Sequence, residues 1–126
     1  MIISDYFLSI ERGLRQNTSV SSIEVEEALA SDEYNGLLRC RAHFWDGSIL
    51  NIHEAVSTEL GYPVRIVYAY TYLREGKCVF RYDNAPHHPE IITFPHHKHT
   101  DEDRLAPTDQ PGLSQVLSEV EGWLDA

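Results

Sequence analysis

Alternation of apolar and polar residues with a period of two runs through the middle of this 126-residue chain. The stretch LLRCRAHFW at residues 37–45 sets apolar side chains against polar ones in the pattern of a half-buried strand. Asp46-Gly47 follows at once, and this pair between alternating runs is a strong hairpin signal, because a tight hairpin turn needs positive φ at both central residues. The centre of the chain is therefore expected to fold as an antiparallel sheet.

Similar runs before and after this hairpin extend the sheet. The run around residues 22–30 is the ambiguous one, since its glutamates and alanines also suit a helix. In the run that begins at Val64, we expect Val64, Ile66 and three tyrosines to share one buried face. We predict an antiparallel meander of about five strands over residues 20–83, with the strand sequences SIEVEE, LLRCRAHFW, SILNIHEAV, VRIVYAYTYL and KCVFRYD.

Apolar side chains at helical spacing precede and follow the predicted sheet in the sequence. They predict an amphipathic helix over residues 1–16, capped by Ser4, and a second helix over residues 113–124. A helix, a sheet and a closing helix make an α+β fold, and a chain of this length suffices for one core. We therefore predict a single domain over residues 1–126.

The charge and the cysteine content narrow the classes of function. The net charge of −10 opposes general attraction to nucleic acid or to an anionic membrane, although residues 36–99 carry seven basic against six acidic side chains. Two cysteines are too few for a disulfide framework. The first residues lack the pattern of a secretory signal, and no apolar run reaches the about 18 residues that span a bilayer. We expect a cytoplasmic protein without a membrane segment.

The segment NAPHHPEIITFPHHKH at residues 84–99 holds five of the seven histidines. Its three prolines exclude a helix, so we predict an extended His-rich loop that is followed by an acidic linker over residues 100–112. In an extended chain His97 and His99 point to one side, and His96 and Lys98 to the other. The loop is expected to fold its histidines around the edge of the sheet where Arg81 and Asp83 leave the last strand.

Three kinds of site fit this loop. The first cleaves RNA without a metal: one imidazole takes the 2′-OH proton, another protonates the leaving 5′-oxygen, and Lys98 or Arg81 stabilises the phosphorane. The second is a zinc site with His87, His97 and His99 as ligands and an open position for water. The third is a structural loop with hydrogen-bonded histidines. The residues alone leave all three open.

The stretch FRYDNAPHHPEIITFPHHKH, with FWDGSILNIHE upstream of it, resembles the TumE family of small toxins from prokaryotic toxin-antitoxin pairs. The resemblance implies a cytoplasmic toxin that is bound and neutralised by a cognate antitoxin, usually a helix-turn-helix protein. It assigns no role to His88 or Glu90. It implies that function depends on the residues at the motif positions, which are Arg81, Asp83, Asn84, His87, His96, His97, Lys98 and His99.

We accordingly predict a toxin that acts as a metal-independent ribonuclease. The proton-transfer pair is His87 and one histidine of the later group, His96, His97 or His99. Arg81 and Lys98 hold the phosphate, and Asp83 orients an imidazole or Arg81. The predicted binding residues are Asn84, Tyr82 and the partner-facing Trp45.

The predicted partners are the antitoxin and RNA or the ribosome, and a homodimer is compatible with the sequence. Two alternatives remain at this point. One is a non-enzymatic protein whose His-rich loop docks a partner, and the other is a zinc-dependent hydrolase.

Overall fold

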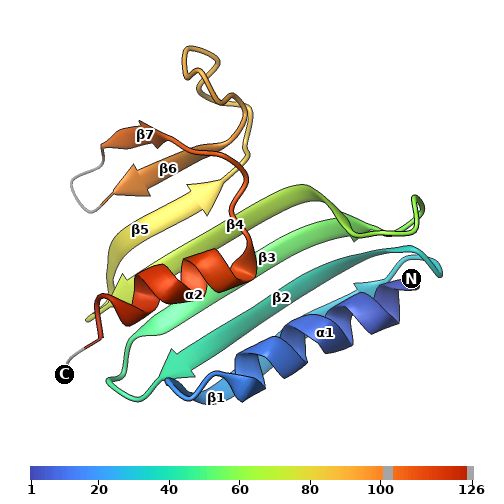
Figure 1. Ribbon diagram of the computed structural model, residues 1–126, viewed down its shortest axis with the longest axis horizontal. Coiled ribbons are helices and arrows are strands. Elements are labelled where there is room, and N and C mark those ends of the chain that lie inside the picture. The colour runs from blue at the N-terminus through green and yellow to red at the C-terminus, as the bar shows by residue number, and fades with distance from the viewer. Residues whose placement is uncertain (101–103, 125–126) are drawn as a thin grey trace.

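A seven-stranded antiparallel sheet with two helices on one of its faces makes up the computed structural model, which describes residues 1–100 and 104–124 (Figure 1). The strands follow one another in chain order across the sheet, so each strand pairs with the next strand along the chain. The predicted α+β meander is confirmed. The elements in chain order are α1 (Ile3–Gln16), β1 (Val20–Ala30), β2 (Asn35–Phe44), β3 (Ile49–Ser57), β4 (Val64–Arg74), β5 (Lys77–Asp83), β6 (His97–Thr100), β7 (Leu105–Pro107) and α2 (Leu113–Glu121).

The predicted number of about five strands is too small, because β6 and β7 extend the sheet beyond β5. The end of the expected His-rich loop pairs with β5, with Asp83 opposite His97, and part of the expected linker pairs with β6. Without β6, the outer edge of β5 would expose a row of unpaired N–H and C=O groups. The remaining residues of the predicted linker include 101–103, which lie outside the described residues.

The ends of the other elements differ in detail from the prediction. Residues 22–30 are a strand rather than a helix, since β1 pairs with β2 along its length. The first helix begins at Ile3, whose N–H donates to the carbonyl oxygen of Glu33 at 2.8 Å, so Ser4 lies inside the helix and does not cap it. The second helix ends at Glu121, before Gly122. None of the helices in the described ranges is long and apolar enough to cross a membrane.

A bulge in β4 separates its buried part from its exposed part. The pairing with β3 shifts so that Ile66 is an extra residue, which leaves Ile66 60% exposed and Val64 at the surface. The prediction that five residues share one buried face is therefore wrong for Val64 and Ile66. The tyrosines of the strand are buried as predicted, and they form the core beneath the helices together with Phe44 and Phe80.

The sheet has one face covered by α1 and α2 and one open face. Tyr6 of α1 donates to Glu54 on the covered face, and Tyr82 on the same face donates to Glu119 of α2. Side chains of the intervening strand positions point to the open face. Two neighbouring rows of residues cross this open face: Arg39, His53, Ala69, Asp83 and His97 form the first row, and Arg41, Asn51, Thr71, Arg81 and His99 form the second.

Candidate functional site

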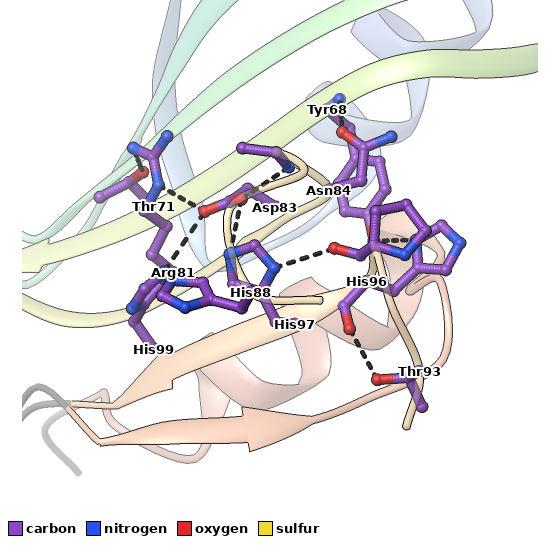
Figure 2. A network of polar contacts seen from close by, with 12 residues as sticks. Tyr68, Thr71, Arg81, Asp83, Asn84, His88, Thr93, His96, His97 and His99 are labelled. Carbon is purple, nitrogen blue, oxygen red and sulfur yellow. Dashed lines mark hydrogen bonds and ion pairs between the residues drawn. The ribbon is translucent and has the colours of Figure 1, made fainter. Parts of the chain in front are cut away.

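The carboxylate of Asp83 is the centre of a polar cluster on the open face (Figure 2). Its side chain is almost wholly buried at the end of β5. Oδ1 lies 2.8 Å from Nε2 of His97 and accepts a hydrogen bond from the backbone N–H of Ala85 at 3.0 Å. Oδ2 accepts from Nε of Arg81 at 3.0 Å and lies 3.6 Å from Nε2 of His99. Asp83 thereby fixes three side chains from two adjacent strands.

His97 is the buried imidazole of the cluster. Its Nδ1 lies 2.9 Å from the carbonyl oxygen of Pro95, while Nε2 faces Asp83. Both partners are acceptors, so the ring satisfies both only when both nitrogens carry a proton. With 3% of its side chain exposed, His97 is enclosed. It positions its neighbours and is poorly placed to exchange protons with a ligand.

His88 completes the cluster from the loop between β5 and β6, as Figure 2 shows. Its ring centroid lies 5.0 Å from that of His97 and 5.8 Å from that of His99, and those two rings are 4.9 Å apart. His87, the predicted residue next to it, is exposed, and the described residues show no side-chain contact between it and the cluster. The sequence holds no signal that distinguishes the two, because the loop has no regular period.

His99 has a pKa that its surroundings lower. Burial lowers the pKa of His99 below its usual value, and the positive charges of neighbouring histidines and Arg81 lower it further, whereas Asp83 acts in the opposite direction. The side chain is nevertheless 31% exposed. A neutral and accessible imidazole can accept a proton, so His99 is suited to act as a base.

The same three imidazoles could hold a metal ion. One ligand nitrogen from each of His88, His97 and His99 can be chosen so that all three lie within 4.8 Å of one another. The bond from His97 to a backbone carbonyl is the second contact that a metal-bound histidine usually makes. Bonds of about 2.0–2.1 Å to zinc would need these nitrogens to move closer together, and Nε2 of His97 would have to leave Asp83. The donor set therefore fits zinc in kind but is more open than a formed site.

A protein-family model described as Toxin TumE matches residues 10–126. The chain belongs to the TumE family. No curated protein and no solved structure matches it. Membership makes it the toxin of a toxin-antitoxin system, with an antitoxin as its partner, as the resemblance of the DNAPH and FPHHKH motifs implied.

Four of the motif positions of this TumE toxin meet at the cluster: Arg81, Asp83, His97 and His99. Lys98 lies on the covered face instead, because neighbouring strand residues point to opposite sides. Its Nζ is 2.7 Å from Glu119 and lies over the rings of two core aromatics. This ion pair holds β6 to α2.

The remaining predicted residues have separate environments. His96 stacks on Tyr68, and its Nδ1 lies 2.8 Å from the tyrosine hydroxyl. Asn84 accepts from the N–H of Tyr68 and donates to the carbonyl oxygen of Ile66, so it fastens the start of the loop to the bulged strand. Tyr82 is buried in the core. Trp45 is 55% exposed beside the turn between β2 and β3.

Proposed function

We propose that this TumE toxin cleaves RNA by metal-independent acid-base chemistry at the cluster on the open face. The observation that carries the proposal is the arrangement of two accessible imidazoles, His88 and His99, beside a guanidinium that is anchored to a buried carboxylate. Cleavage of RNA through attack by the 2′-hydroxyl needs a base, an acid and a positive group that stabilises the phosphorane. The cluster contains all three types within one small area.

In this reaction the imidazole of His99 accepts the proton of the 2′-hydroxyl, and the 2′-oxygen attacks the phosphorus. The bond from phosphorus to the 5′-oxygen breaks, and that oxygen takes a proton from His88 in its charged form. The products are a cyclic 2′,3′-phosphate and a free 5′-hydroxyl. The lowered pKa of His99 supports its assignment as the base, and the 34% exposure of the His88 side chain supports access of that ring to the leaving group.

Arg81 stabilises the developing charge on the phosphate. Its Nε donates to Asp83 and its Nη1 donates to Thr71 at 3.2 Å, which fixes the plane of the guanidinium. The group has five N–H donors, so these contacts leave donors for a phosphate oxygen. The side chain is 45% exposed and can meet a ligand without rearrangement of the sheet.

The test compares His88→Gln and His99→Gln with His87→Gln, a matched change one residue away and outside the cluster. Each folded variant is assayed for cleavage of RNA and for growth arrest upon induction. We expect His88→Gln and His99→Gln to lower the cleavage rate about 10²- to 10⁴-fold. We expect His87→Gln to leave it unchanged. Full cleavage by a His88→Gln, His99→Gln double variant would refute the proposal, and loss through His87→Gln would return the acid role to that residue.

A zinc-dependent hydrolase is the second candidate, favoured by the approach of three imidazole nitrogens to within 4.8 Å. Metal analysis of the purified protein and assay in chelator separate the two chemistries. Metal-independent cleavage keeps its full rate in chelator. A zinc hydrolase loses activity there, regains it with added zinc, and contains zinc in a one-to-one ratio. Growth arrest without any RNA cleavage would instead support a protein that acts by docking a partner.

A further inference from the structure

A hollow of about 250 Å³ lies on the open face next to the histidine cluster. Arg39, Arg41, His53 and Arg81 contribute its basic lining, and Ala69 lies between them with little exposed surface. Arg81 belongs to both the hollow and the cluster. A ligand that occupies the hollow is therefore adjacent to the proposed reaction centre.

We call this hollow the basic groove; Arg39, Arg41, Asn51, His53 and Arg81 line it. We infer that the basic groove holds the phosphate backbone of a single RNA strand and leads that strand to the cluster. The inference rests on the proposed function, because it names where the substrate lies beyond the cleaved bond. Its occupant is an RNA strand rather than an isolated phosphate, since the groove continues into the cluster along the two rows of the open face.

The register of the sheet gives the groove its length. His53 is two strands away from Asp83 in the same row, with Ala69 between them. Neighbouring strands are about 4.8 Å apart, so the two side chains start about 10 Å from each other. A strand with one phosphate at Arg81 can therefore reach His53 with a neighbouring nucleotide. The small side chain of Ala69 leaves the floor low enough for the backbone to pass.

The arginines of the groove can exchange their glutamate partners for a ligand. Arg41 pairs with Glu26 at 2.9 Å, and Arg39 lies 4.0 Å from Glu27. All four of these side chains are at least 40% exposed, and pairs of this kind contribute only about 0–1 kcal/mol. A phosphate can therefore replace either carboxylate at small cost.

The electrostatic environment of His53 agrees with a positive groove. Burial lowers the pKa of His53, and Arg39 and Arg81 lower it further, while Glu27 and Glu54 act in the opposite direction. The two arginines lie on strands to either side of His53. Their fields therefore overlap at the middle of the groove, where an anion gains most.

An unpartnered oxygen in the groove points to RNA in particular. Oδ1 of Asn51 is buried and has no hydrogen-bond donor among the described residues. Buried acceptors are nearly always satisfied by protein or by water, so this atom can take a donor from water or from a ligand. A ribose 2′-hydroxyl is a donor that DNA lacks. Asn51 accordingly favours RNA over a DNA strand of the same sequence.

The test measures binding apart from cleavage. All proteins carry His99→Gln, which blocks the proposed reaction, and the probe is a short fluorescent single-stranded RNA of mixed sequence. An Arg39→Gln, Arg41→Gln variant is compared with an Arg12→Gln, Arg15→Gln variant, in which the same charge is lost from exposed positions on α1. Circular dichroism checks the fold of each protein.

We expect the groove variant to bind RNA at least about 10-fold more weakly at low salt than the helix variant. Its plot of log K against log salt should be flatter by about 1.4, the value for two phosphate contacts on a single strand. Asn51→Ala should reduce the preference for RNA over the matching DNA. Equal losses in the groove and helix variants would overturn the inference, because only net charge would then matter.

Failure of the groove and failure of the chemistry give different results. If RNA binding depends on Arg39 and Arg41 but the wild-type protein never cleaves RNA, the ribonuclease proposal fails and the groove stands. If the wild-type protein cleaves RNA but the groove variant binds RNA as the helix variant does, the groove inference fails alone. The inference is also overturned if the groove variant keeps its affinity for RNA and loses affinity for the antitoxin.

Discussion

Removal of the Asp83 carboxylate tests whether the cluster is organised around a buried charge pair. Asp83 is 4% exposed and His97 is 2% exposed, so neither group is well solvated. Loss of one partner from a buried charge pair costs about 3–5 kcal/mol. The substitution also leaves the N–H groups of Arg81 and Ala85 without their acceptor, so we expect Asp83→Ala to reduce the free energy of unfolding by about 3 kcal/mol. The midpoint of thermal unfolding should fall by about 10 °C.

The assay is urea unfolding of Asp83→Ala, His97→Ala and the double variant, with Asp109→Ala as a control at an exposed carboxylate. If the two side chains act as a pair, the double variant should be more stable than the sum of the single losses implies, by about 1.5 kcal/mol or more. Asp83→Asn should cost less than Asp83→Ala, because the amide oxygen can still accept from the N–H of Ala85. Additive losses within about 0.5 kcal/mol would refute the charge pair.

Three further predictions concern stability. Glu54 is enclosed and accepts from two tyrosine hydroxyls, so Glu54→Leu should cost about 2–5 kcal/mol in urea unfolding, and a loss under 1 kcal/mol would contradict this. The pKa values of His53 and His99 are lowered in the folded protein, so the unfolded chain binds more protons below about pH 6.5. Stability should therefore fall as the pH drops below that value, and His99→Gln should flatten the slope in thermal unfolding at a series of pH values. A Cβ on Gly36 would lie 2.6 Å from a carbonyl oxygen of β1, so Gly36→Ala should cost about 1–3 kcal/mol, whereas Gly13→Ala in the open part of α1 should add about 0.5–1 kcal/mol.

The first five strands could be predicted from sequence because each carries its own pattern. Alternation over residues 37–45 and the Asp46-Gly47 turn fix the central hairpin locally, and the structure has that hairpin. The strands β6 and β7 carry no apolar alternation. They form because β5 offers an unpaired edge, which is a tertiary cause that no short window of sequence contains.

The candidate site could be predicted in part for a similar reason. The spacing of two residues correctly groups Arg81 with Asp83 and His97 with His99, since a strand sends alternate side chains to the same face. The same rule separates Lys98 from them. The choice between His87 and His88 depends on the path of an irregular loop, and the arginines of the groove look from sequence like partners of the glutamates on β1.

The order of the two rows along the chain has a consequence for the timing of synthesis. The side chains of the groove up to Thr71 leave the ribosome before Arg81, and His99 follows 28 residues after Thr71. At about 5–20 residues per second, this separation lasts roughly 1–6 s. On the proposed chemistry, a nascent toxin acquires the surface that holds RNA first, and it becomes able to cut only when the last strands pair with β5. An antitoxin that recognised β1 to β4 could meet the toxin while it was still harmless.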